Sequence, residues 1–244
     1  MKKLIRLELQ KNNWKPYWIT TSITTLVMLG FIYLIALIPY LEPRDDDAVL
    51  FGTYNFVIGL SIDVMTGIFT IMSTTMLAKI IVEEYEKKAI VFFSYPIARK
   101  KFLTAKIITC LLYTCFLMII SGTIVLSIFI GTEKMFPLCI SDVISIQLIL
   151  RCFFRLVCYT MVTVFCSTVS LWIGFYRKSG IVTIVVACII VVFICQIITM
   201  TFYSDMLLFV LLLVLIMLSF IAIKSMQDRV VTVSYTHLTL PTIL

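Results

Sequence analysis

Charged side chains are scarce in this chain of 244 residues. Lys, Arg, Asp and Glu together make up 14% of the sequence, whereas 61% of it is hydrophobic. A water-soluble core of ordinary size cannot enclose that much apolar surface. The composition therefore excludes a soluble globular domain and predicts an integral membrane protein.

The sequence also lacks the residue sets of several kinds of site. The single histidine, His237, lies close to the C-terminus, and neither Cys-x-x-Cys nor His-Glu-x-x-His spacing occurs. We therefore predict no metal site and no catalytic residues, because the usual ligands and bases are missing. The eight cysteines are scattered through mostly apolar segments, which favours small packing residues over a disulfide framework. No Gly-x-x-x-x-Gly-Lys-Ser/Thr loop is present, so if ATP drives this protein, another chain binds it.

Long apolar runs dominate what is present. A helix needs roughly 20 apolar residues to cross a bilayer, and six runs approach this length. The predicted spans are 17–41, 56–82, 107–130, 152–176, 181–202 and 206–223. The expected fold class is all-α, a polytopic membrane protein with six transmembrane helices.

The segment 143–150 is apolar but is cut off from the fourth span by Arg151. Such a segment lies flat on the membrane or dips into its outer leaflet. A seventh span is the alternative, although eight apolar residues are too short to cross a bilayer alone.

The distribution of basic residues predicts the orientation. With the N-terminus inside, sixteen Lys and Arg residues fall on the cytoplasmic side, whereas only Arg44 and Lys134 are clearly outside. Short cytoplasmic loops carry an excess of Lys and Arg. Both termini are therefore expected in the cytoplasm.

The first thirteen residues mix Leu4, Ile5 and Leu9 with basic residues. This pattern suits a short helix in the lipid interface, with its cations facing anionic head groups. The helix is either an elbow that leads into the first span or a positive N-terminus that only sets topology.

The longest charged interruption of the apolar sequence covers residues 83–106. The charged residues toward its two ends include Glu83, Glu84, Arg99, Lys100 and Lys101. Between them, Pro96 suits the first turn of a helix, and Ser94 just ahead can accept a bond from a free backbone N–H. The pattern predicts a cytoplasmic loop with its own short helix over about 96–102.

This loop resembles the loop between the second and third spans of ABC transporter permeases of the type-2 exporter kind. In that family a glutamate at the end of the second span leads to Ser-x-Pro-Ile-Ser-Arg, a basic pair and a lysine. The matching positions here are Glu83, Glu84, Ser94, Pro96, Ile97, Arg99, Lys100 and Lys106. The six-span layout extends the resemblance over about residues 1–229.

The resemblance implies that this stretch, with Lys101, is a coupling element on which a cytoplasmic ABC ATPase docks. The chain would be a permease of the bacterial cytoplasmic membrane that works with a second copy or a related permease and binds no nucleic acid. It would not be an enzyme and would hold no cofactor, since the partner ATPase binds ATP and Mg. The substrates implied are peptide antibiotics, drugs or other amphipathic molecules, which it would export.

Three ionisable residues lie at membrane depth or at its outer edge: Asp63, Arg151 and Arg155. Such charges require a partner or an aqueous cavity. The two arginines are four residues apart and share a helix face, so they either pair with Asp63 or line a substrate exit. A relay through these groups is the basis of an alternative function, an ion- or proton-coupled carrier or channel.

The last residues, 230–244, change to a Thr-rich pattern that fits no span. The run 233–242 resembles translated sequencing-adapter read-through. We therefore expect a tail that is disordered or non-native.

Overall fold

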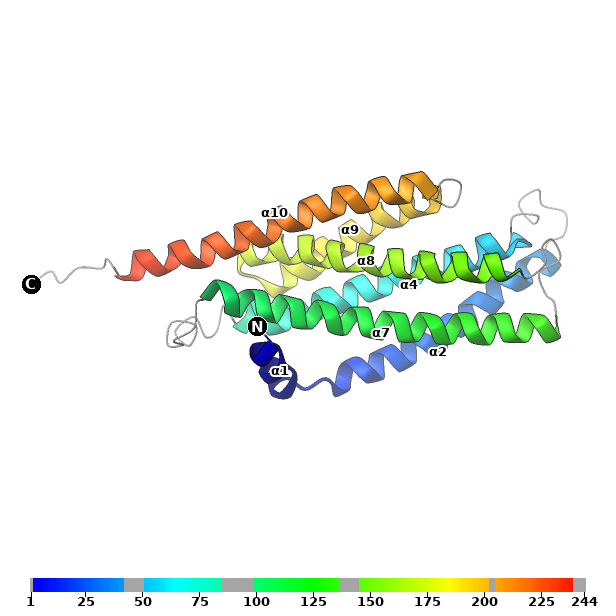
Figure 1. The fold of residues 1–244 in the computed structure, drawn as a ribbon, viewed down its shortest axis with the longest axis horizontal. Helices are drawn as coiled ribbons and strands as arrows, with labels where there is room; N and C mark the ends of the chain where they lie inside the picture. Colours follow the sequence, from blue (N-terminus) through cyan, green and yellow to red (C-terminus); the bar gives the residue numbers. More distant parts are fainter. Residues whose placement is uncertain (1, 42–50, 85–98, 137–144, 202–204, 239–244) are drawn as a thin grey trace, which may run out of the picture.

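The computed structural model describes residues 2–41, 51–84, 99–136, 145–201 and 205–238, and it is helical throughout these ranges apart from short connections (Figure 1). The helices are α1 (Lys2–Lys11), α2 (Lys15–Leu41), α4 (Tyr54–Leu77), the π-helical η1 (Ala78–Val82), α7 (Arg99–Met135), α8 (Ile146–Arg177), α9 (Gly180–Thr201) and α10 (Asp205–Leu238). Within the described ranges, six helical segments are long and apolar enough to cross a membrane. This confirms the predicted six-span, all-α fold.

Helix α4 is the central element of the bundle. It packs against α2, α7, α8 and α9, and it is the most enclosed of the six spans. Its core residues include Phe69, which is fully buried. Helices α9 and α10 follow α8 on one side of the bundle, and both expose most of their apolar surface.

Hydroxyl side chains inside the bundle form hydrogen bonds to groups of their own helix or of a neighbouring helix. The hydroxyls of Thr66, Thr70 and Thr74 in α4 each donate to the carbonyl four residues earlier, at 2.7–2.8 Å. Other hydroxyls join neighbouring helices, as in the 2.6 Å contact between Thr25 and Ser121. Because a bilayer offers no water to unpaired groups, these bonds allow threonine and serine to occupy apolar spans.

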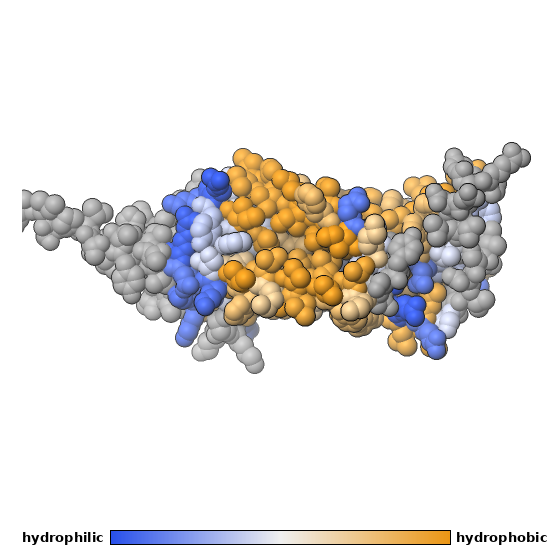
Figure 2. Space-filling view, turned by 90° about the horizontal axis from the view of Figure 1, so that it is seen from above, coloured by the Kyte–Doolittle hydropathy of each residue, from blue (hydrophilic) through white to orange (hydrophobic). Residues whose placement is uncertain are grey.

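The surface carries an apolar belt. Figure 2 shows hydrophobic residues covering the middle of the molecule, with hydrophilic bands near both ends. Large side chains such as Phe193 and Leu213 are more than 60% exposed on α9 and α10. A belt of this kind fits contact with lipid rather than with water.

The helices extend beyond the predicted spans. Helix α8 begins at Ile146, where the Ser145 hydroxyl accepts a hydrogen bond from the Gln147 backbone N–H at 3.3 Å. Residues 146–150 therefore continue into the fourth span, and the expectation of a flat segment or a seventh span is wrong for them. The single charge of Arg151 does not interrupt the helix, because it is exposed near the helix start.

Helix α10 also runs further than expected, to Leu238. The tail predicted from residue 230 is thus helical in its backbone as far as residue 238, and residues 239–244 lie outside the described ranges. The sequence contains no helix-breaking Gly or Pro between Ile223 and Leu238, so the helix of the last span continues past the apolar run.

A close approach of α8 and α9 depends on one glycine. A Cβ atom placed on Gly174 would lie 1.8 Å from Thr183 Oγ1 and 2.9 Å from the Thr183 Cα. The chain turns between these helices at Lys178, which has a left-handed φ of 53° and caps α8. Gly174 thus allows α9 to fold back closely onto α8.

Candidate functional site: a charged junction of three helices

One end of the bundle gathers α1, the end of α4 with η1, and the first turns of α7; we call it the α1 end (Figure 1). The residues on both sides of the 85–98 segment lie here, since η1 leads to Glu84 and α7 begins at Arg99. The site is therefore built from the two described ends of the predicted coupling loop.

The second span ends in a π-helical turn. In η1 the backbone hydrogen bonds run five residues back, and the N–H of Glu83 donates to the carbonyl of Ala78. Such turns are rare and occur often at functional sites. The wider turn changes the direction in which the following side chains point, and these are Glu83 and Glu84.

Glu84 joins three helices through ion pairs. One carboxylate oxygen accepts a hydrogen bond from the Lys11 ammonium of α1 at 2.8 Å, and the other accepts from the Lys106 ammonium of α7. Lys106 is fully buried, whereas Lys11 is exposed. The Lys106 ammonium also lies 4.9 Å from the centre of the Phe102 ring. We call Lys11, Glu84 and Lys106 the ion junction.

The ion junction changes the titration of Glu84. Burial raises the pKa of its carboxyl, but the hydrogen bonds and charges of Lys106 and Lys11 outweigh burial and hold the pKa below its ordinary value. Glu84 therefore stays ionised at neutral pH. The contribution of the Glu84 carboxylate to the stability of the fold is fully present above the ordinary pKa of a glutamate. It is lost as the pH falls through the lowered pKa of Glu84.

The connection between α1 and α2 is fixed to α7 by aromatic contacts as well. The rings of Trp14 and Tyr113 lie 4.3 Å apart, and the Trp14 indole N–H donates to the carbonyl of Leu9 at 2.6 Å. The turn from α1 into the first span is thus packed against the third span. This contact supports the elbow interpretation of the N-terminal helix over a free, positive N-terminus.

The start of α7 is also tied to the last helix. Lys100 forms an ion pair with Asp228 at 2.8 Å, and the Gln227 amide donates to the Thr104 hydroxyl at 2.8 Å. The Arg229 guanidinium lies 4.2 Å from the centre of the Tyr176 ring of α8. The Lys100–Asp228 pair is exposed, so it contributes little to the free energy of unfolding.

The remaining predicted coupling residues are placed only in part. Ser94, Pro96 and Ile97 lie outside the described residues, as does the first part, 96–98, of the predicted helix at 96–102. Its last residues, 99–102, belong to the first turn of α7 and are continuous with the third span. Lys101 is exposed there.

The three membrane charges are not brought together as one group. Asp63 and Arg155 are buried, whereas Arg151 is exposed. The ion pairs found among the described residues do not include Asp63, whose Oδ1 has no hydrogen-bond partner and which lies beside the Cys195 thiol of α9. The predicted pairing of Asp63 with an arginine is thus absent from this structure.

This environment predicts the effect of Asp63→Asn. Since no ion pair is lost and the amide has nearly the same shape, we expect the free energy of unfolding to change by less than about 1 kcal/mol. Breaking a buried ion pair would instead cost roughly 3–5 kcal/mol. Thermal denaturation in detergent distinguishes the two, and a large loss of stability would show that Asp63 has a cationic partner.

Sequence reasoning missed the partner of Glu84. The family pattern includes Lys106, and the pattern of the first thirteen residues predicts that their cations, which include Lys11, face lipid head groups. Neither pattern predicts that these lysines pair with the glutamate. One signal was available, because a lysine such as Lys106 at the start of a span requires a counter-charge if its helix face is buried. The contribution of Lys11 depends on how α1 folds back, which no local pattern specifies.

Together, the belt, the six spans and the charged junction define a polytopic helical membrane protein. The family described as ABC-2 family transporter protein matches residues 4–195, and the chain belongs to this family. Membership of this family identifies the chain as a transporter protein of the membrane.

One curated relative is similar over part of its length. The uncharacterized protein YcbO of Bacillus subtilis (strain 168) is 33% identical over 105 residues, which are 43% of this chain and 44% of that protein. The match therefore spans less than half of the relative. No solved structure matches the chain.

Proposed function

We propose that the α1 end faces the cytoplasm and that an ABC ATPase docks there, on the loop between α4 and α7. The observation that carries this proposal is the ion junction. Glu84 stands directly before the 85–98 segment, and Lys106 lies two turns into the helix that follows it. A movement of the loop would therefore act on α4 and α7 together, and on α1 through Lys11.

The packing of α4 supports a role in transmission. Because α4 contacts α2, α7, α8 and α9, a displacement of its end changes the packing of most of the other spans. ATP binding by the partner would close the ATPase pair and push the loop, and the spans would switch between inward and outward access. ATP and Mg stay on the partner, and this chain contributes no catalytic residue.

The orientation follows from the basic residues at the α1 end, under the positive-inside rule. We propose that the permease works in the bacterial cytoplasmic membrane, as two copies or with a related permease. Its substrate would be a peptide antibiotic, a drug or another amphipathic molecule, exported from the cell. The exposed apolar faces of α9 and α10 offer surface for lipid or for the second permease.

Inside-out vesicles test the function. Vesicles that contain this chain and its native partners should accumulate a fluorescent amphipathic probe when ATP is added, also after an ionophore has collapsed the proton gradient. Vesicles from cells that lack this chain are the control. Accumulation that requires the gradient and ignores ATP would refute the proposal.

A further prediction concerns the docking role of the loop itself. Pro96→Gly and Arg99→Lys should leave membrane insertion and orientation intact but reduce ATPase association or substrate-stimulated ATP hydrolysis. Proline fixes the direction of the chain, and a guanidinium presents donors that an ammonium cannot reproduce. Co-purification of the ATPase, together with a cysteine-accessibility map of topology, measures both properties. Unchanged transport in both variants would show that this stretch is a cytoplasmic loop whose cations only set the topology.

An ion- or proton-coupled carrier is the second candidate. The buried Asp63, with one carboxylate oxygen that lacks a hydrogen-bond partner, favours it. Ionisable groups inside membranes often mark ion paths. A single acid without a chain of further groups makes this candidate weaker, and the ionophore arm of the vesicle experiment separates the two.

A further inference from the structure

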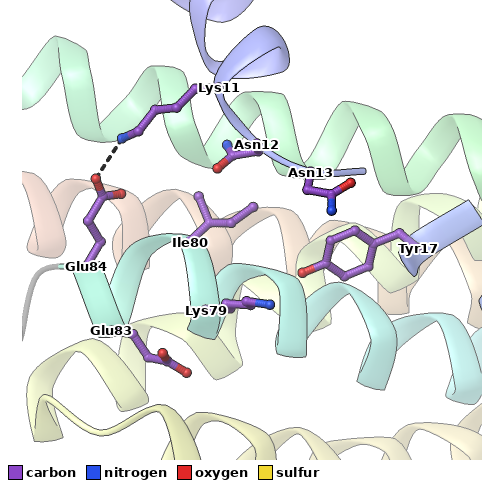
Figure 3. Close-up of a pocket in the computed structure, with 8 residues that line it drawn as sticks. All are labelled: Lys11, Asn12, Asn13, Tyr17, Lys79, Ile80, Glu83 and Glu84. Carbon is purple, nitrogen blue, oxygen red and sulfur yellow. Dashed lines mark hydrogen bonds and ion pairs between the residues drawn. The ribbon is translucent and has the colours of Figure 1, made fainter. Parts of the chain in front are cut away.

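A cavity of about 340 Å³ opens at the α1 end, between η1 and the turn that joins α1 to α2 (Figure 3). It is lined by residues of both elements, among them Asn13, Tyr17 and Lys79. The cavity adjoins the ion junction, since Lys11 and Glu84 form part of its wall. The ATPase-coupling role proposed above does not use this space.

Three hydrogen-bond donors face the cavity without a partner among the described residues. The Lys79 side chain is exposed and forms no ion pair there, although it lies at the end of a membrane span. Figure 3 shows its ammonium directed toward the Tyr17 hydroxyl. Asn13 uses its amide oxygen to accept from the Lys15 backbone N–H at 3.2 Å, which leaves its NH₂ group to donate.

One cation of the cavity wall is available to an anion. Glu84 is neutralised by its two lysine partners, and the remaining charges at the wall are those of Lys79 and Glu83. The wall itself thus balances Lys11 and Lys79 against Glu83 and Glu84, and Lys79 is the cation among them that forms no ion pair within the described residues. A phosphate group offers oxygen acceptors to a lysine ammonium and to neutral donors at the same time.

The cavity also lies at the level expected for lipid head groups. Helix α1 exposes Leu7 and Leu9 beside the cations Arg6 and Lys11. Short helices with exposed apolar and basic residues lie in the membrane interface. Lys79 stands within the last turns of a span that ends at Val82, so its ammonium reaches the same level.

We propose that this cavity binds the phosphodiester head group of a bilayer phospholipid. The Lys79 ammonium pairs with the phosphate, and the Tyr17 hydroxyl and the Asn13 amide donate hydrogen bonds to its oxygens. The lipid links the α1–α2 turn to the end of α4. This site depends on the membrane position of the α1 end and not on the identity of the ATPase or of the substrate.

Native mass spectrometry of the detergent-solubilised protein with added phosphatidylglycerol tests the site. Lys79→Met should lower the affinity of the bound lipid about tenfold, and Tyr17→Phe about threefold, as expected for a charged and a neutral partner. Lys224→Met is the matched control, because Lys224 is an exposed lysine of α10 that does not line the cavity. Glycerol 3-phosphate at the same concentration should not displace the lipid.

Each other outcome overturns the proposal. Unchanged lipid affinity in Lys79→Met would remove the central contact, and an equal loss in Lys224→Met would indicate a general effect of surface charge. Displacement by glycerol 3-phosphate would show a site for free phosphate rather than for lipid. If Lys79→Met fails to fold, unchanged affinity in Tyr17→Phe combined with Asn13→Ala overturns the assignment.

Discussion

Replacing Glu84 by alanine should lower the free energy of unfolding by about 3–5 kcal/mol. The cause is Lys106, which is fully buried and is neutralised by the Glu84 carboxylate. Without Glu84, the buried Lys106 ammonium loses its carboxylate partner in the packed interface between η1 and α7. Thermal denaturation in detergent micelles measures the loss, and ATP hydrolysis by the co-purified complex measures its effect on coupling.

Two further variants separate the partners of Glu84. Lys11→Met should cost no more than about 1 kcal/mol, since Lys11 is exposed and its pair is screened by solvent. Glu84→Ala combined with Lys106→Met should recover most of the stability, because the buried cation is removed together with its carboxylate partner. A double variant as unstable as Glu84→Ala alone would show that the ion junction is not the cause.

Gly174→Ala should destabilise the protein by about 1–3 kcal/mol, in spite of the higher helix propensity of alanine. The added Cβ would meet both the side chain and the backbone of Thr183, so rotation of the threonine cannot relieve the clash. Helix α9 would have to move away from α8. The melting temperature in detergent should fall accordingly.

A matched glycine provides the control. Gly131 also lies within a helix, but a Cβ atom placed there would have no neighbour within 4 Å. Gly131→Ala should therefore be neutral or slightly stabilising. Thr183→Gly should rescue Gly174→Ala in part by removing the contacted side chain. Equal melting temperatures for Gly174→Ala and Gly131→Ala would contradict the close packing of α8 and α9.

The spans were predictable because bilayer thickness imposes a minimum length on apolar helices. Their ends were not, since helices continue beyond the apolar run until a breaker or a capping residue stops them. Ser145 begins α8 ahead of Arg151, and no breaker stops α10 before Leu238. Hydropathy reports the part of a helix that lies in lipid, and it does not report these extensions.

The candidate site was predictable in its position but not in its contacts. The charges at Glu84 and Lys106 marked the two sides of the loop, because charge is costly inside the apolar spans. Glu84 follows the π-helical turn of η1, and no local sequence pattern in this chain predicts that turn or the direction of the side chains after it. The positions of Asp63 and Arg155 within apolar spans suggested a contact between them, but Asp63 lies beside Cys195 of α9 instead.

Purification of the tagged chain from native membranes tests most directly whether an ATPase works through the ion junction. Mass spectrometry of the purified complex should identify an ABC ATPase that carries the nucleotide-binding loop this chain lacks. The complex should hydrolyse ATP, and Glu84→Gln should lower the substrate-stimulated rate while the ATPase still co-purifies. A chain that purifies without any ATPase and moves substrate alone, driven by a proton gradient, would contradict the proposal that an ATPase works through the ion junction.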